Sequence, residues 1–156
     1  MSVDIIGKID YVRLFEELRP FIDNNQREVM IQGAPNESDQ YGKGRSANLK
    51  HSESEFTNTL HDIPYMNSIL KEYGMVRTRL LRLRPHECYT YHMDPTARIH
   101  IPIITSVWCL AVIDDIVHRY PADGSVYYVD TTKRHTFINS GDTDRFHIVG
   151  VLSGHL

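Results

Sequence analysis

The second half of the sequence has the pattern of several short β-strands. In the stretch that begins at Arg98, Ile99, Ile101 and Ile103 lie on one side and Arg98 and His100 on the other, and this strict alternation predicts a strand with two different faces. Further strands are predicted at residues 107–113, 126–129, 136–138 and 146–152, separated by turn signals at Pro85, Pro95, residues 123–124 and residues 140–142. Many short strands with frequent turns are typical of a β-barrel or β-sandwich, and we expect the isoleucines to be buried against N-terminal helices.

The first half is more polar and shows helical spacing in two places. Residues 10–18 place apolar side chains at helical intervals, and Asp10 is suited to capping the helix that they predict. We expect Pro20 to end or bend this helix, since proline lacks the N–H that a helix interior needs. A second helix is predicted at residues 63–73, with Gly74 as its C-terminal cap.

A long loop is predicted between these helices. Residues 32–52 contain several glycines and a proline, and loops of this length in a small domain are often functional or disordered. A length of 156 residues suits one compact domain. We therefore expect a single domain over residues 1–156, with helices and loops in residues 1–75 and the β-core in residues 76–156.

Composition and charge narrow the class of protein. Hydrophobic residues make up 41% and charged residues 24% of the chain, as in ordinary globular proteins. The sequence has neither an apolar run of eighteen residues nor an N-terminal signal-peptide pattern, so we expect a cytoplasmic protein that does not contact membranes. A net charge of −3 argues against a nucleic-acid partner. We expect both cysteines, Cys88 and Cys109, to be reduced thiols in strands.

The strongest chemical signal is the tripeptide that runs from His92 to Asp94. His135 follows 43 residues after His92. Two histidines and one carboxylate form the facial triad of non-haem Fe(II) sites, which leaves coordination positions open for an oxo-acid and dioxygen. The alternative is that His-x-Asp occurs by chance and His135 is an ordinary strand histidine.

Arg145 is the second signal, ten residues after His135. The turn at residues 139–142 predicts that His135 and Arg145 lie on adjacent antiparallel strands. Arg145, His147 and Val149 would then face inward, where an arginine is costly unless it pairs with an anion such as a ligand carboxylate. The alternative is a surface arginine at a turn. For His147 two interpretations are equally open: it lies near such a ligand, or it packs in the core.

Arg98 and His100 admit two interpretations. Taken alone, these two residues favour a solvated strand face. Beside His92 and Arg145, they favour a second anion-binding pair.

These motifs, taken together, resemble the aspartyl/asparaginyl β-hydroxylase-like group, to which certain free-proline hydroxylases are related. The residues that carry the resemblance are the string from His92 to Pro102, followed by Asp130, His135, Asn139 and Arg145. The resemblance covers residues 80–152. It implies a mainly β fold, a double-stranded β-helix (a jelly-roll, cupin-like barrel), with helices packed on one sheet.

The resemblance also implies an activity. Members of the group are Fe(II)- and 2-oxoglutarate-dependent dioxygenases that consume O2, hydroxylate a substrate and release succinate and CO2. Carried over by motif, His92, Asp94 and His135 would be the catalytic iron ligands. Some members replace the carboxylate ligand with glycine, and this chain keeps Asp94. The substrate would be an amino acid or a peptidyl side chain.

The cosubstrate residues are implied in the same way. Arg145 would hold the distal carboxylate of 2-oxoglutarate, and His100, with Arg98, would contact the carboxylate nearer the metal. Tyr89 stands in a Tyr-x-x-His-x-Asp pattern similar to that of prolyl hydroxylases, where the tyrosine contacts the cosubstrate; core packing is equally open. The alternatives are a non-catalytic jelly-roll module that binds a small acid or a partner protein, and a cupin with different metal chemistry.

Other residues carry weaker expectations. Trp108 is expected in the core. The arginine stripe of Arg77, Arg79, Arg82 and Arg84 is expected at a solvated strand edge, although an inward member could bind a substrate carboxylate. His51, His61 and His118 are expected at the surface. The loop of residues 32–52, with Tyr41 and Arg45, is expected to close over substrate, since oxygenases exclude water from a reactive intermediate.

Overall fold

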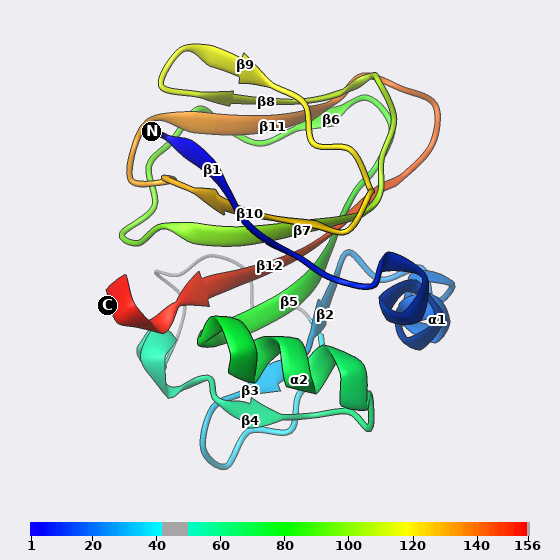
Figure 1. Ribbon diagram of the computed structural model, residues 1–156, viewed down its shortest axis with the longest axis vertical. Coiled ribbons are helices and arrows are strands. Elements are labelled where there is room, and N and C mark those ends of the chain that lie inside the picture. The colour runs from blue at the N-terminus through cyan, green and yellow to red at the C-terminus, as the bar shows by residue number, and fades with distance from the viewer. Residues whose placement is uncertain (42–49, 156) are drawn as a thin grey trace.

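Two antiparallel sheets face each other in this computed structural model (Figure 1), which describes residues 1–41 and 50–155. The elements in chain order are β1 (Val3–Lys8), α1 (Tyr11–Ile22), β2 (Glu28–Met30), β3 (Gln32–Gly33), η2 (Glu53–Glu55), β4 (Asn58–Thr59), α2 (Pro64–Tyr73), β5 (Met75–Leu83), β6 (Glu87–Cys88), β7 (Arg98–Ile104), β8 (Cys109–Ile113), β9 (Ile116–His118), β10 (Ser125–Val129), β11 (His135–Asn139), β12 (Arg145–Leu152) and η3 (Ser153–His155). The predicted mainly β class with N-terminal helices is confirmed.

The larger sheet has six strands in the order β1-β10-β7-β12-β5-β2, and the smaller sheet has four in the order β6-β11-β8-β9. A short pair, β3-β4, lies apart from both. Both helices lie on the outer side of the larger sheet, away from the smaller one (Figure 1). Strands far apart in sequence are therefore neighbours, as in a jelly roll.

The central strand β7 is buried on both of its faces. On the outer face, Ile99, Ile101 and Ile103 pack with the helix residues Leu14 and Met66 in one apolar cluster. The predicted burial of the isoleucines against the helices is confirmed. The alternate residues of β7 face the smaller sheet, and polar side chains can occupy that face only if partners satisfy them.

Strand β12 repeats this arrangement beside β7. Phe146 and Ile148 join the outer apolar cluster, whereas Arg145, His147 and Val149 alternate with them and are also buried. The predicted alternation along this strand is confirmed. The side predicted as outward is covered by helices, so this strand too is buried on both faces.

The helices begin as predicted, but one ends later. Asp10 accepts a hydrogen bond from the backbone N–H of Arg13 at 3.2 Å and caps α1. Of the two outcomes expected for Pro20, an end to the helix is wrong, because α1 continues to Ile22, and a bend stays a prediction. Proline removes one N–H but leaves the preceding turn able to form. Gly74 ends α2 with a φ of 61°, the left-handed conformation that favours glycine.

Residues 1–75 contain strands that the sequence did not reveal. Strand β1 pairs with β10 at one edge of the larger sheet, and β2 pairs with β5 at the other. The division at residue 75 therefore does not mark the start of the sheet. Ile5 and Ile6 of β1 are largely exposed, so this edge strand lacks the alternation of a half-buried strand.

The predicted loop at residues 32–52 is shorter than expected. It begins with β3, and Tyr41 forms a β-bridge with Val29. Residues 42–49, with Arg45, lie outside the described residues. Tyr41 is exposed, and the expectation that the loop closes over substrate stays a prediction.

The prediction that Trp108 belongs to the core is wrong. Its side chain is 62% exposed, and the neighbouring Val107 is also exposed. The strand β8 begins only at Cys109, because Trp108 lies in a turn where the N–H of Cys109 bonds the carbonyl of Ser106. An apolar run therefore overstated the length of the strand. Both cysteines are free and lie in strands, as predicted.

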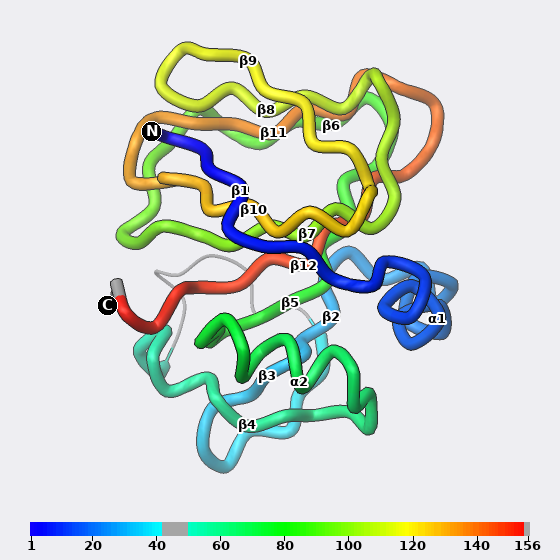
Figure 2. The backbone as a smooth tube through the Cα atoms, viewed as in Figure 1, coloured from blue at the N-terminus to red at the C-terminus, as the bar shows by residue number. Residues whose placement is uncertain are grey.

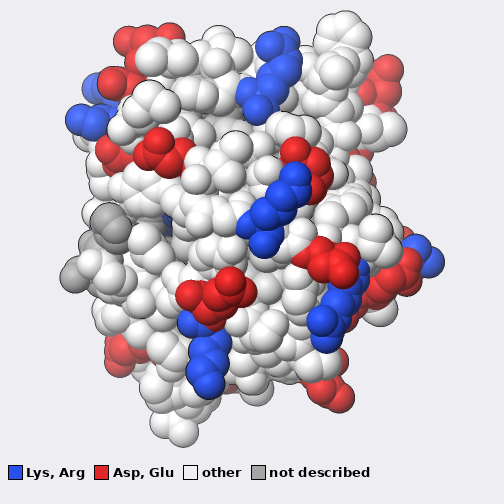
Figure 3. Space-filling model, viewed as in Figure 1, with Lys and Arg blue, Asp and Glu red and all other residues white. Residues whose placement is uncertain are grey.

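Three observations concern the helices, the chain ends and the charged surface. Within residues 1–41 and 50–155, neither helix combines the length and apolar character needed to cross a bilayer. Both chain ends lie on the same side of the molecule (Figure 2). On the face shown in Figure 3, basic side chains are scattered beside acidic ones instead of gathering into one patch.

Candidate active site

A cavity of about 690 Å³ opens where the inner faces of the two sheets meet. Strands β5, β7 and β12 of the larger sheet, β11 of the smaller sheet and residues 88–95 supply most of its wall. All seven residues predicted for metal and cosubstrate line it: Tyr89, His92, Asp94, Arg98, His100, His135 and Arg145. The fold thus gathers residues from four separate segments around one space.

Three metal-capable side chains meet at one point of this wall. The ligand atoms of His92, Asp94 and His135 all lie within 4.8 Å of one another. The Asp94 carboxylate stands between the two rings, with Oδ1 at 3.6 Å from His92 Nε2 and Oδ2 at 3.5 Å from His135 Nε2. Two imidazoles and one carboxylate arranged in this way can serve as a facial triad.

The backbone holds the two imidazoles in place. His92 and His135 form an isolated antiparallel bridge, with N–H···O distances of 3.0 and 2.8 Å in the two directions. The Nδ1 of His92 lies 2.6 Å from the carbonyl of Thr90, and the Nδ1 of His135 lies 2.9 Å from the carbonyl of Lys133. A carbonyl only accepts, so Nδ1 is the donor in each bond, and Nε2 is the ring nitrogen that each histidine can turn to a metal. Such outer hydrogen bonds orient metal-binding histidines.

The charge of Asp94 is set by competing effects. Burial raises the pKa of its carboxyl, but His135 and Arg98 favour the ionised form and bring the pKa down to about 2. Arg98 lies 3.6 Å from Asp94 through Nε. The carboxylate is therefore ionised at neutral pH, as a metal ligand must be.

Arg98 also belongs to a buried charge cluster that the sequence did not reveal. Its Nη2 lies 3.2 Å from Glu53 Oε2, and Arg77 Nη1 lies 2.8 Å from the same oxygen. Thr96 donates to Glu53 and is hydrogen-bonded with Arg98 as well. Burial raises the pKa of Glu53, but Arg98 and Arg77 outweigh it and hold this pKa below its usual value. Glu53 comes from the short helix η2, where no local pattern marks it as a site residue.

Arg145 is only 2% exposed and lacks a carboxylate partner among the described residues. Its Nε and Nη1 atoms have no hydrogen-bond partner there. Its guanidinium lies 5.4 Å from the ring centroid of Phe137. Burial lowers the pKa of Arg145, and the nearby Tyr89 side chain, which hydrogen-bonds it, acts in the opposite direction. A buried cation with free N–H groups can pair with an incoming carboxylate.

The predicted relation between His135 and Arg145 needs a correction. The strand β11 pairs with β6 and β8, whereas β12 pairs with β5 and β7. The two residues therefore lie in opposite sheets, not on adjacent strands. Asn139 ties the two sheets together at this crossing, because its amide donates to the carbonyls of Leu83 in β5 and of Thr143. Both residues still line the same cavity.

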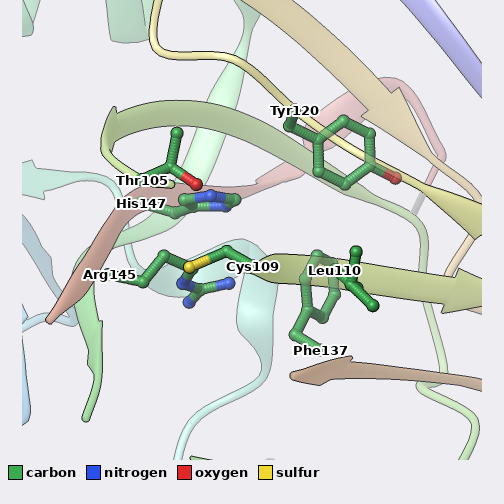
Figure 4. A pocket seen from close by; sticks show the side chains of 7 residues that line it. All are labelled: Thr105, Cys109, Leu110, Tyr120, Phe137, Arg145 and His147. Atoms are coloured by element: carbon green, nitrogen blue, oxygen red, sulfur yellow. The ribbon is translucent and has the colours of Figure 1, made fainter. Parts of the chain in front are cut away.

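A second, small pocket of about 10 Å³ lies on the other side of Arg145. Figure 4 shows Arg145 and His147 entering it together from β12. His147 is buried, and its Nδ1 lies 3.1 Å from Nδ1 of His100, which lines the large cavity. Arg98 and His100 are both buried, which excludes the alternative of a solvated strand face for them.

The arginine stripe of β5 is not a uniform solvated edge. Arg77 is 1% and Arg79 9% exposed, and both line the large cavity. Arg79 Nη1 lies 3.2 Å from Glu28 Oε1, while its Nε has no partner among the described residues. Arg82 points to the other face and forms an ion pair with Asp144 at 2.5 Å. The expectation of a solvated edge is wrong for the first two because the cavity lies behind the strand.

The histidines expected at the surface are partly buried. His51, His61 and His118 are each neither fully exposed nor fully enclosed. His61 Nε2 lies 2.8 Å from the carbonyl of Met30 and thus ties the β4–α2 connection to β2. None of the three lines the large cavity.

Comparisons with known proteins bear on the family and the fold of this chain. A family model described as aspartyl/asparaginyl beta-hydroxylase matches residues 10–151, more of the chain than the predicted resemblance covered. No curated protein matched the chain. Among solved structures, it is similar to an oxidoreductase of the 2OG-Fe(II) oxygenase family from Burkholderia pseudomallei, with 18% identity, a TM-score of 0.51 and coverage of 96% of this chain and 83% of that one. It is also similar to AviO1 from Streptomyces viridochromogenes Tue57, with 14% identity, a TM-score of 0.51 and coverage of 96% and 88%. At these identities the likeness shows the fold alone, and it confirms the predicted jelly-roll class.

Proposed function

The chain belongs to the aspartyl/asparaginyl beta-hydroxylase family, and on that premise we propose that it is an Fe(II)- and 2-oxoglutarate-dependent dioxygenase. The reaction would hydroxylate an amino acid or a peptidyl side chain. A substrate C–H bond, O2 and 2-oxoglutarate would give a C–OH group, succinate and CO2. One oxygen atom of O2 would enter the hydroxyl group and the other the new carboxylate of succinate.

The observation that carries the proposal is the set of three ligand atoms within 4.8 Å. His92 and His135 can turn Nε2 to a metal, because their Nδ1 atoms are bonded to backbone carbonyls. Asp94 adds an ionised oxygen between them. This donor set fits Fe(II), which when bound supplies open positions for a keto acid and dioxygen.

The cavity offers separate partners for the two ends of 2-oxoglutarate. Arg145, with its free N–H groups, would pair with the carboxylate far from the metal. Tyr89 would assist there through its contact with Arg145. Arg98 lies 3.6 Å from Asp94 and His100 lines the same cavity, and both would contact the other carboxylate. These roles agree with the burial of Arg98, His100 and Arg145 around one space, where Tyr89 is partly buried.

The remaining wall favours an acidic substrate. A volume of about 690 Å³ exceeds what a five-carbon diacid fills. Arg79 faces this volume with an Nε that has no partner among the described residues. A carboxylate on the substrate, as in a free amino acid or an acidic side chain, would satisfy it.

An anaerobic titration tests the proposal. Metal-free protein is titrated with Fe(II), with 2-oxoglutarate and with both, and visible absorbance is recorded. We expect a weak charge-transfer band that requires both components. If folded, iron-loaded protein gives no such band, the cosubstrate assignment is wrong, and a binding module or a cupin with other metal chemistry takes its place.

The substrate is then sought by succinate release. Amino acids and short peptides, each with a free carboxylate and as the matching amide, are added under air with Fe(II) and 2-oxoglutarate. We expect the acids to stimulate succinate release more than the amides. Equal stimulation by acid and amide would contradict the acidic-substrate assignment. Asp142→Ala, which removes a fully exposed carboxylate, is the control for nonspecific effects.

A further inference from the structure

We propose that His147 is a positioning residue that fixes the tautomer of His100. It would make His100 Nε2 a hydrogen-bond donor toward an anion in the large cavity. The inference rests on the proposed function, because this anion would be the carboxylate of 2-oxoglutarate nearer the metal. The role of His147 is indirect, since it lines the small pocket and not the large one.

The two histidines are neighbours on the inner face of the larger sheet. In the β7–β12 ladder, Val149 stands opposite His100 and His147 opposite Pro102. The two side chains therefore meet diagonally, with Nδ1 atoms 3.1 Å apart and rings at 81°. The His100 ring also stacks on Phe137 of the facing sheet, with centroids 4.7 Å apart. This packing leaves each ring only its Nε2 for any other polar partner.

Both rings are neutral in this environment. Burial lowers the pKa of His100 and of His147 well below the usual value, and the charge of Arg145 acts in the same direction. A neutral imidazole carries one N–H. One Nδ1 of the pair must therefore donate and the other accept, because two bare or two protonated nitrogens at 3.1 Å would not bond.

The direction of this bond decides what His100 offers to the cavity. If His147 donates, His100 holds its hydrogen on Nε2 and can donate to a carboxylate. If His100 donates, its Nε2 is bare and would repel a carboxylate. One hydrogen on His147 thus determines whether the cavity wall attracts or repels an anion at this place.

The anion expected from the proposed function requires donation by His147, and the charge of Arg145 is compatible with it. A carboxylate in the large cavity accepts hydrogen bonds only, so it requires the His100 Nε2–H tautomer. On the other side, His147 shares its pocket of about 10 Å³ with the cation of Arg145 (Figure 4). A bare His147 Nε2 beside a guanidinium is favourable, whereas an N–H there would face a positive charge. Arg145 lines the large cavity with His100 as well, so the anion expected in that cavity is what fixes the direction of the bond.

Nuclear magnetic resonance of the metal-free protein tests this directly. In a sample labelled with ¹⁵N, two-bond ¹H–¹⁵N correlations distinguish a protonated ring nitrogen from a bare one. We expect His147 to carry its hydrogen on Nδ1 and His100 on Nε2. The opposite pattern, with His100 protonated on Nδ1, would overturn the inference whatever the protein's activity.

Two variants test the consequence for binding. His147→Phe keeps the ring size but removes the donor, and we expect about a tenfold weaker apparent affinity for 2-oxoglutarate in the anaerobic titration. His147→Asn places an amide N–H at the same distance along the side chain as Nδ1 and should restore most of this affinity. His86→Asn, at an exposed turn, is the matched control and should bind as the parent does.

The outcomes separate this inference from the proposed function. If the parent protein gives no charge-transfer band, the proposed function fails, while the tautomer of His100 is still read independently. If the band forms but His147→Phe and His147→Asn bind alike, His147 does not position His100. If His147→Phe fails to fold, the tautomer pattern of the parent and the affinity of His147→Asn decide the question.

Discussion

Arg145 lets us predict a change that stabilises the protein and disables it. The substitution Arg145→Met removes a cation that is 2% exposed and whose Nε and Nη1 have no partner in the described part of the chain. Each unsatisfied buried donor costs about 1–3 kcal/mol, and part of this gain is lost with the contact to Tyr89. We therefore expect the free energy of unfolding of metal-free Arg145→Met to exceed that of the parent by about 1–3 kcal/mol.

The assay is thermal unfolding of metal-free protein followed by circular dichroism. For a chain of this length, each kcal/mol moves the Tm by about 2–4 °C, so Arg145→Met should unfold roughly 2–12 °C higher than the parent. The matched control is Arg82→Met, from the paired neighbouring strand. Arg82 already has Asp144 as a partner, so this control should leave the Tm unchanged or lower it by a few degrees.

Binding should move in the opposite direction. Loss of a buried charge-assisted contact costs about 2–5 kcal/mol, which weakens the apparent affinity for 2-oxoglutarate by roughly 30- to 3000-fold. If Arg145→Met lowers the Tm as much as Arg82→Met does, the chain itself satisfies Arg145 and our reasoning about its free N–H groups is wrong. If affinity for 2-oxoglutarate is unchanged, Arg145 does not bind it.

Three further predictions concern Asp94 and Trp108. Asp94→Ala should abolish succinate release in the presence of Fe(II) and 2-oxoglutarate, and retained release would count against the ligand assignment. The folded protein holds the pKa of Asp94 at about 2 against an ordinary 3.8, so its ionised form stabilises the metal-free protein above pH 4 and this contribution disappears as the pH falls through 2. In urea unfolding, the free energy of unfolding of the parent should therefore fall by at most about 2 kcal/mol more than that of Asp94→Asn between pH 5 and pH 2. An equal fall in the two proteins would contradict this. Trp108 is 62% exposed, so its fluorescence should be red-shifted and readily quenched by acrylamide in the native protein, and a blue-shifted, protected emission would show that the turn is packed.

Alternation was the most reliable guide to the fold. The pattern from Arg98 to Ile103 predicted both the buried isoleucines and the opposite polar side, because the period of a strand is fixed by its backbone. The pattern could not show whether the polar side faces solvent or a cavity, because an arginine can occupy either place. For that reason Arg77 and Arg79 were expected at an edge, although they line the interior.

Pairing between distant segments was beyond the sequence. The turn after Asn139 suggested a hairpin, but the chain crosses there to the other sheet. Asn139 donates to two carbonyls at this crossing. Glu53 has no neighbouring pattern, and only the tertiary fold places it between Arg77 and Arg98. The candidate ligands were recognisable from their spacing, whereas the carboxylate that pairs with the arginines around them was not.

The wall of the large cavity has two origins along the chain. Every residue proposed for metal and cosubstrate follows position 88, whereas Glu28, Arg77 and Arg79 come from earlier strands. Substitutions in β2 and β5 can therefore reshape the space proposed for substrate while the proposed iron ligands keep their sequence and their backbone bridge. A collection of variants restricted to these two strands would explore new substrates with the oxidative chemistry held constant, and relatives of this chain could diverge in the same way.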